Sequence, residues 1–173
     1  MLKKTFIFLF ILFCSQSLQA TAPVTVRILW DYQNVTREMK IFEPDSRPLT
    51  LWQMGNTFKK EELPISQEIT ASTLKLMPGM KKQFILVFQN TTDKPIRFFA
   101  APHQATPLEN SFGFKFHCLC INHIYDVKPG EYWYRVVEFH LAKEFVGDHL
   151  DIKHVLVGVD DSRKNPDTSI HKH

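Results

Sequence analysis

Two cysteines one residue apart, Cys118 and Cys120, lie between His117 and His123. Thiolates are soft ligands, and they favour Cu(I) and zinc over hard, oxygen-seeking cations. On a β-strand, residues i and i+2 project to the same face about 6.5–7 Å apart, so that modest side-chain rotation can direct both sulfurs at one ion. The residue types and their spacing therefore predict a soft-metal site with Cys118 and Cys120 as ligands.

Two histidines close in sequence, His117 and His123, are the natural auxiliary metal ligands. His117 has the opposite strand parity to the thiols, so it joins them only at a bulge or a strand end. His123 follows Asn122 in a segment expected to turn, which gives its side chain more freedom. We interpret four other histidines as single packed or solvated strand residues: His103, His140, His149 and His154.

Two alternatives to a metal site remain open for the cysteine pair. A disulfide prefers a Cα separation of about 5.5–6 Å, which neighbours on one strand face do not supply well. A strained bridge would be easily reduced, so a reversible redox role stays open. Both cysteines could also be small buried hydrophobes, because free cysteine is among the most buried residue types. The even-numbered face that they share also carries Phe112, Phe114 and Phe116.

The first residues have the pattern of an export signal. Lys3 and Lys4 precede a short apolar run, and Ala20 and Ala22 fit an A-x-A cleavage site. This pattern predicts a secretory signal peptide at residues 1–22 that leaves with Cys14. The apolar run falls short of the ~20 residues needed to span a bilayer. We therefore expect an exported, periplasmic protein, with a retained membrane anchor as the less favoured alternative.

The composition after the leader argues against two classes of function. Without Lys3 and Lys4, 19 basic residues face 18 acidic ones, a net charge of +1. Nucleic-acid binding is not expected, because it needs a basic footprint. The sequence also lacks the G-x-S-x-G, H-E-x-x-H, P-loop and dinucleotide-binding motifs. We therefore expect a protein that is not an enzyme.

Short apolar runs between turn residues predict an all-β sandwich as a single domain over residues 23–160. Pro78-Gly79 and Pro129-Gly130 each place Pro then Gly at the centre of a type II turn. Residues 24–64 read as irregular strands at a sandwich edge, and residues 161–173 as a disordered tail. The clearest expected strands are Val24–Ile28, Leu74–Leu76, Phe84–Phe88, Ile96–Ala100, Tyr132–Ala142 and His149–Val159.

From Leu74 to Val159 the order of motifs resembles the CtaG-type copper-delivery proteins of cytochrome c oxidase assembly. The departures are Leu119 and Ile121, which stand where the family has phenylalanine, and Arg135, which begins a Val-rich run in place of Met-Pro-Val. The segments that carry the resemblance are Met77-Pro78-Gly79, Gln89 to Pro95, Ala101 to Pro107, Phe112 to Ile121 and Pro129-Gly130-Glu131.

The resemblance implies an immunoglobulin-like β-sandwich that holds Cu(I) on the thiolates of Cys118 and Cys120 and passes it on by ligand exchange. It implies a cuproprotein client, such as a cytochrome c oxidase subunit, and a second chain could complete the shell as a copper-bridged homodimer. Two hypotheses follow. The chain is an exported Cu(I) chaperone, or it is a sandwich-fold interaction module or thiol redox partner with buried cysteines and no metal.

Overall fold

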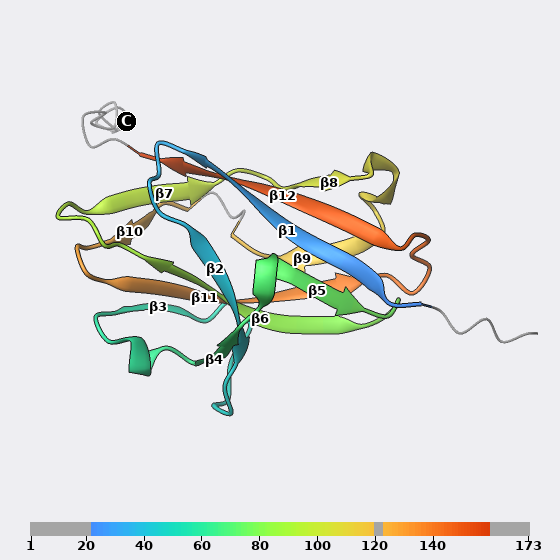
Figure 1. The fold of residues 1–173 in the computed structure, drawn as a ribbon, viewed down its shortest axis with the longest axis horizontal. Helices are drawn as coiled ribbons and strands as arrows, with labels where there is room; N and C mark the ends of the chain where they lie inside the picture. The colour runs from blue at the N-terminus through green and yellow to red at the C-terminus, as the bar shows by residue number, and fades with distance from the viewer. Residues whose placement is uncertain (1–21, 120–122, 160–173) are drawn as a thin grey trace, which may run out of the picture.

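Two six-stranded β-sheets pack face to face in the computed structural model, which describes residues 22–119 and 123–159 (Figure 1). The strands are β1 (Val24–Gln33), β2 (Met39–Pro44), β3 (Met54–Thr57), β4 (Ile65–Glu68), β5 (Thr73–Leu76), β6 (Lys81–Gln89), β7 (Ile96–Ala100), β8 (Gln104–Thr106), β9 (Phe114–His117), β10 (Tyr125–Val127), β11 (Tyr132–Leu141) and β12 (His149–Gly158). Three short 3₁₀ turns join them: η1 (Lys60–Glu62), η2 (Thr70–Ser72) and η3 (Leu108–Asn110).

This architecture confirms the predicted all-β sandwich, and it is consistent with an immunoglobulin-like arrangement. Within the described ranges, no helix is long and apolar enough to cross a membrane. The predicted signal peptide, apart from Ala22, and the predicted tail at 161–173 lie outside the described residues, as does Cys120.

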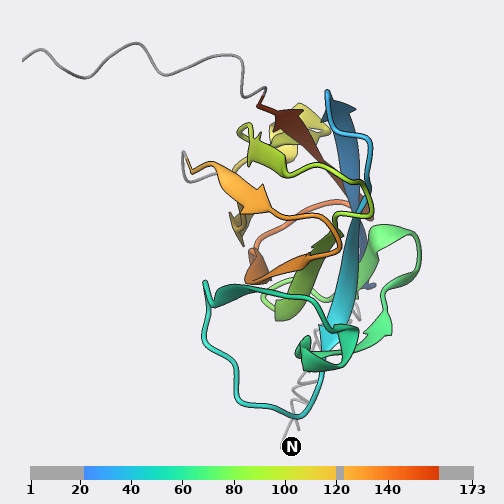
Figure 2. The ribbon, with the colours of Figure 1, turned by 90° about the vertical axis from the view of Figure 1, so that its left-hand side faces the viewer.

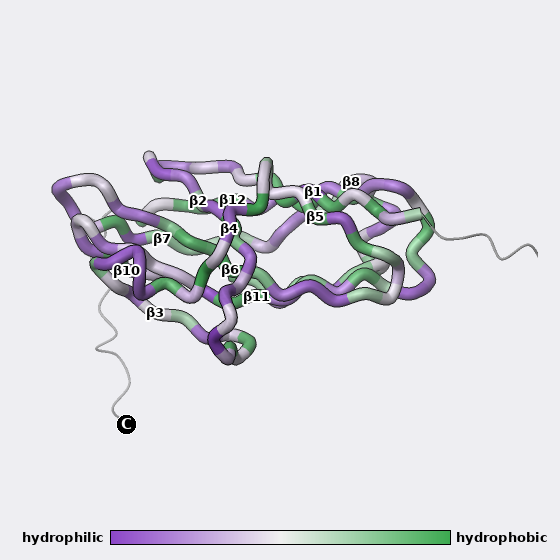
Figure 3. The backbone as a smooth tube through the Cα atoms, turned by 60° about the horizontal axis from the view of Figure 1, so that its bottom comes forward, coloured by the Kyte–Doolittle hydropathy of each residue, from purple (hydrophilic) through white to green (hydrophobic). Residues whose placement is uncertain are grey.

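The first sheet has the strand order β10-β7-β12-β1-β5, with β8 pairing to β12. β1 and β12 run parallel, so that Ile28 pairs with Ile152, and the other pairs in this sheet are antiparallel. Alternate residues of β1 are buried while their neighbours face outward, as expected for a sheet with one face on the core. Figure 3 shows this change between hydrophobic and hydrophilic residues along the strands.

The second sheet has the order β3-β11-β6-β2-β4, with β9 pairing to β11. Phe116 of β9 lies opposite Phe139 of β11, and this register directs both rings into the core. The two sheets form separate layers, which are seen from the side in Figure 2. The core between them is rich in aromatic side chains, including Phe84, Phe88, Phe98, Phe139 and Trp133.

Strand β6 is a continuous apolar run because both of its faces are covered. Phe84, Leu86 and Phe88 face the core between the sheets, whereas Ile85 and Val87 belong to a second cluster on the outer face. That second cluster also contains Phe42, Leu63 and Val136. Because both faces of β6 are covered, the strand needs no polar alternation.

Two sequence expectations about loops and edges have different outcomes. Gly79 and Gly130 have φ values of +86° and +76°, as the predicted type II turns require. The expectation that residues 24–64 form irregular edge strands is wrong for β1 and β2. Both lie inside their sheets, because β1 pairs with β12 and β5 and β2 pairs with β6 and β4, whereas β3 does form an edge.

Candidate metal centre

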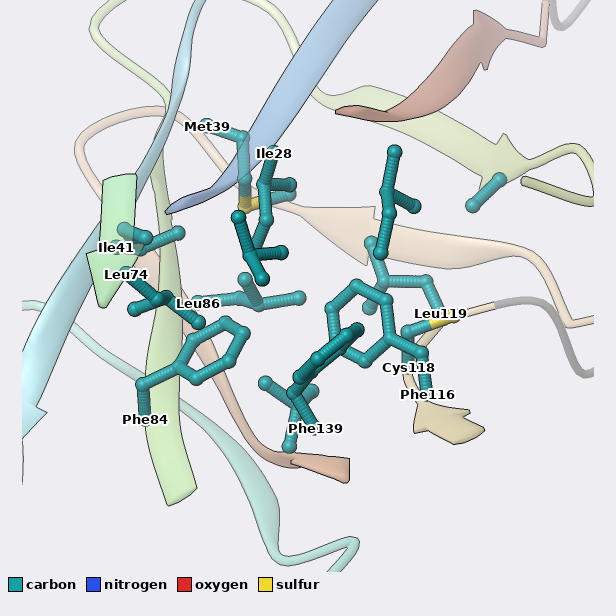
Figure 4. Close-up of a cluster of buried hydrophobic side chains, with 14 of the residues drawn as sticks. Ile28, Met39, Ile41, Leu74, Phe84, Leu86, Phe116, Cys118, Leu119 and Phe139 are labelled. Atoms are coloured by element: carbon teal, nitrogen blue, oxygen red, sulfur yellow. The ribbon is translucent and has the colours of Figure 1, made fainter. Parts of the chain in front are cut away.

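Cys118 follows the last residue of β9 and points into the core. Its side chain is only 3% exposed, and Leu119 beside it is fully buried. The strand ends at His117, so the alternation that would have placed Cys118 and Cys120 on one strand face ends there too. Figure 4 shows Cys118 beside Phe116 and Leu119 in the cluster of buried side chains. The burial of Cys118 agrees with the alternative of a core cysteine, but its neighbours are not only hydrocarbon.

His103 brings an imidazole to the sulfur from the other sheet. It lies in the connection between β7 and β8, and its Nδ1 is 3.6 Å from Sγ of Cys118. The half-buried ring packs against Phe114 and Phe116, with ring centroids 5.6 and 5.9 Å away. The connection is held by β7 and β8 at its two ends, and Phe114 and Phe116 pack against the ring. These contacts fix the position of the His103 side chain.

His154 supplies a second imidazole from β12 and is fully buried. Its ring stacks on Trp30 at 5.2 Å and meets Phe116 edge-on at 5.3 Å. The ring centroids of His103 and His154 are 5.4 Å apart. One ligand atom each from His103, Cys118 and His154 lies within 4.8 Å of the other two, which makes this group a candidate metal site.

These separations can be compared with the demands of a three-coordinate ion. Bond lengths of about 2.0–2.3 Å, as histidine nitrogen and cysteine sulfur make to a first-row ion, put two ligand atoms about 3.8 Å apart at a 120° angle. The observed Cys118–His103 separation of 3.6 Å is close to that value. The largest separation, up to 4.8 Å, needs a contraction of about 1 Å, within reach of small side-chain rotations.

The three side chains come from both layers of the sandwich. Cys118 follows β9, which belongs to the sheet of β11, whereas His154 lies on β12 and His103 comes directly before β8, both in the sheet of β1. An ion held by all three would join the two sheets across the core. A metal at this position would therefore be part of the packing between the layers.

The other predicted ligands lie elsewhere. His117 projects away from Cys118, as its parity predicts, and stacks on Trp52 with a centroid distance of 5.6 Å. His123 is exposed and meets Tyr125 edge-on at 4.9 Å. Neither belongs to the three-residue cluster among the described residues, so an auxiliary role for either remains a prediction.

Sequence reasoning missed His103 and His154 as partners of Cys118. His154 is indeed a packed strand residue, as interpreted, but it is not single. One signal was present: His154 shares the buried face of β12 with Leu150, Ile152 and Leu156, where a histidine has to find a polar contact. His103 had no comparable signal, because its position depends on the pairing of β8 with β12.

A second set of contacts holds the backbone next to Cys118. The buried guanidinium of Arg135 lies 4.8 Å from the ring centroid of Trp52, and its Nη1 donates a 2.7 Å hydrogen bond to the hydroxyl of Tyr125. That hydroxyl donates a longer bond, 3.4 Å, to the carbonyl of Leu119. Arg135 is thus linked to the cysteine segment through Tyr125.

Comparison with known families gives a match without a function. Residues 24–159 match the family described as "Domain of unknown function (DUF8709)". The match covers every strand of the sandwich and all three residues of the candidate centre. No curated protein matches the chain.

Proposed function

The chain belongs to the DUF8709 family of unknown function, and we propose that it is an exported Cu(I) carrier that delivers copper for the assembly of a cuproprotein. The observation that carries the proposal is the grouping of Cys118, His103 and His154, with ligand atoms within 4.8 Å of one another. One thiolate and two imidazoles are soft to intermediate donors, the kinds that select copper and zinc.

The number of ligands favours Cu(I) over zinc. Structural zinc sites are almost always tetrahedral, with four protein ligands, and catalytic sites hold a water in the fourth position. Among the described residues, the cluster offers three donors and is enclosed by Trp30 and Phe116. A trigonal Cu(I) site uses three donors and leaves the ion open to an incoming ligand. Cys120, which lies outside the described residues, remains the predicted second thiolate, and in a trigonal shell it would take the place of one imidazole rather than add a fourth donor.

The proposed compartment and the proposed client rest on two features of the sequence. The predicted leader places the domain in the periplasm, and the resemblance to CtaG-type proteins points to a haem–copper (cytochrome c) oxidase subunit as the client. In such a carrier Cys118 holds the ion, and His103 and His154 complete the shell until the client's ligands replace them. No covalent chemistry on a substrate is required, in keeping with the absence of catalytic motifs from the sequence.

Cu(I) titration against a competing chelator tests the proposal. We expect the reduced wild-type protein to bind one Cu(I) per one or two chains. We expect Cys118→Ser to lose this binding, because serine offers no soft donor. Cys120→Ser tests whether the second thiol contributes. If Cys118→Ser binds Cu(I) as tightly as the wild type, the proposal is wrong.

A second candidate is electron transfer, favoured by the donor set itself. One cysteine and two histidines in a trigonal arrangement are the equatorial ligands of blue-copper sites. The two functions predict different oxidation states. A stable Cu(II) form with an intense thiolate-to-copper absorption would assign electron transfer, whereas bound copper that stays colourless Cu(I) in air would support the carrier.

The burial of Cys118 also fits a protein that binds no metal. A sulfur 3% exposed and 3.6 Å from an imidazole nitrogen is compatible with a weak S–H···N hydrogen bond in a packed core. In that case the protein binds no Cu(I), and a thiol reagent reacts with Cys118 only on unfolding. Alkylation of the folded protein therefore separates this interpretation from the carrier.

A further inference from the structure

A hollow of about 360 Å³ opens on the surface next to His103. It lies between the β7–β8 connection with β8, the η3 turn and the start of β9. Its walls include Gln104, Leu108, Ser111 and Phe114. The hollow is distinct from two larger cavities beside β2 and from a third larger one lined by Asn34, Arg97 and Val159.

His103 is shared between this hollow and the candidate centre. Its ring lines the hollow, while its Nδ1 is 3.6 Å from Sγ of Cys118. Of the three clustered side chains, His103 is the half-buried one, and it comes from the connection between β7 and β8. Cys118 and His154 are buried, and Phe116 packs against both imidazoles. Displacement of the His103 ring would therefore open a path from the surface to the sulfur.

The chemistry of the hollow restricts what can use this path. Among the described residues, its lining contains no carboxylate, amine or guanidinium, and His103 is the only titratable side chain. Leu108, 78% exposed, gives it an apolar rim. A charged carboxylate would lose its hydration here without an ion-pair partner, whereas a thioether or a thiol enters at little cost.

We propose that the copper acceptor's sulfur ligand reaches the ion through this hollow and replaces His103 first. The inference rests on the proposed carrier function and names its route of transfer. The copper–nitrogen bond to His103 breaks as a copper–sulfur bond to the incoming group forms, and the ion stays Cu(I) throughout. When the incoming group is a thiol, its proton passes to the released imidazole nitrogen. His154 and Cys118 hold the ion until further acceptor ligands arrive.

A tryptophan at the hollow tests the route. Ser111→Trp places a large ring in it, and Ser66→Trp is the matched control. Both serine hydroxyls donate to a backbone carbonyl, and Ser66 lines a separate hollow with Asp45 and Arg47. Leu108→Trp serves as a second blocking variant if Ser111→Trp fails to fold.

The first measurement is the rate of Cu(I) transfer from each loaded protein to excess dithiothreitol, a small uncharged thiol. We expect Ser111→Trp to bind Cu(I) with unchanged affinity but to release it at least about tenfold more slowly, a barrier raised by about 1.4 kcal/mol. We expect Ser66→Trp to transfer at the wild-type rate. Equal transfer rates in Ser111→Trp, Leu108→Trp and wild type would overturn the proposed route.

The second measurement needs no copper and separates failure of the route from failure of the function. Alkylation of Cys118 by iodoacetamide is followed by mass spectrometry in metal-free protein carrying Cys120→Ser. The route predicts slower alkylation in Ser111→Trp and no change in Ser66→Trp. If this holds but the wild type binds no Cu(I), the hollow leads to the thiol and the carrier function is wrong. If alkylation is equally fast in all variants, the route is wrong whatever the protein binds.

Discussion

At the scale of single residues, the candidate centre combines one buried thiol with two imidazoles that differ in exposure. Cys118 and His154 are buried, and the His154 ring packs against Trp30 and Phe116, whereas His103 is half-buried and borders a surface hollow. This asymmetry assigns different parts to the two histidines. In the proposed carrier His154 would retain the ion, and His103 would yield it to an incoming ligand.

We predict that His154→Leu keeps the fold but weakens Cu(I) binding. Leucine is apolar and fits a fully buried position, so packing with Trp30 is largely kept. We expect the affinity for Cu(I) to fall by at least about tenfold, the lower bound for losing even an outer-shell partner of a metal site. The measurement is competition with a Cu(I) chelator.

His149→Leu is the control for this prediction. His149 lies on the same strand, β12, but it is exposed and contacts Asp148 at 2.7 Å. Its replacement should leave Cu(I) affinity unchanged. Equal Cu(I) affinities for His154→Leu and His149→Leu would show that His154 is not a copper ligand.

At the scale of the elements, the sequence predicts where strands occur more surely than which strands pair with each other. Ile96–Ala100 is found with the expected bounds, because its apolar run is closed by turn residues at both ends. The three-residue strands β8 and β10 are too short to leave a pattern, and they were missed. The parallel pairing of β1 with β12 joins the two ends of the domain, and no local signal reports it.

The candidate site follows the same rule: a feature set by neighbouring residues could be predicted from the sequence, and a contact between distant segments could not. Cys118 is recognisable from its own neighbours, because an unusual residue type repeats at a short spacing. His103 lies 15 positions away and meets Cys118 only once the two sheets are stacked. The expected strand face for Cys118 and Cys120 also depended on β9 continuing past His117, where it ends.

The contact between β1 and β2 carries a pH-dependent contribution to stability. The hydroxyl of Tyr32 accepts a 2.8 Å hydrogen bond from the backbone N–H of Met39. Burial is the main cause that raises the pKa of Tyr32 from 10.0 to about 12. The unfolded chain therefore loses this proton first as the pH rises. The contribution of Tyr32 to the free energy of unfolding is complete below pH 10 and is lost as the pH rises towards 12.

We predict that Tyr32→Phe is less stable than wild type at neutral pH, by about 1 kcal/mol for the lost hydrogen bond. We also predict that this difference shrinks between pH 10 and 12, because only the wild type has the raised Tyr32 pKa. Urea unfolding at pH values below and above 10 measures both effects. A difference that stays constant over this range would contradict the assigned cause.

At the scale of the whole molecule, the candidate centre lies where the two sheets meet. Its donors come from β12, the β7–β8 connection and the residue after β9, so an ion would cross-link both layers. A ligand that binds only the folded state adds to its stability by mass action. Copper loading is therefore expected to stabilise the entire sandwich rather than one loop.

We predict that Cu(I) raises the thermal midpoint of the reduced protein. With free Cu(I) at 100 times the dissociation constant, the gain is about 2.7 kcal/mol. For a domain of this size that gain corresponds to about 5–10 °C. Calorimetry with a buffered Cu(I) supply measures the shift. Cys118→Ser should show none, and an equal shift in that variant would place the bound copper elsewhere.

In the proposed carrier Cys118 holds Cu(I) together with His103 and His154, and X-ray absorption of the Cu(I)-loaded protein measures this ligand set. We predict a copper shell that contains both sulfur and imidazole nitrogen. We also predict that the imidazole contribution disappears in the double variant His103→Ala/His154→Ala. A shell made of sulfur alone, unchanged by the double variant, would contradict this ligand set.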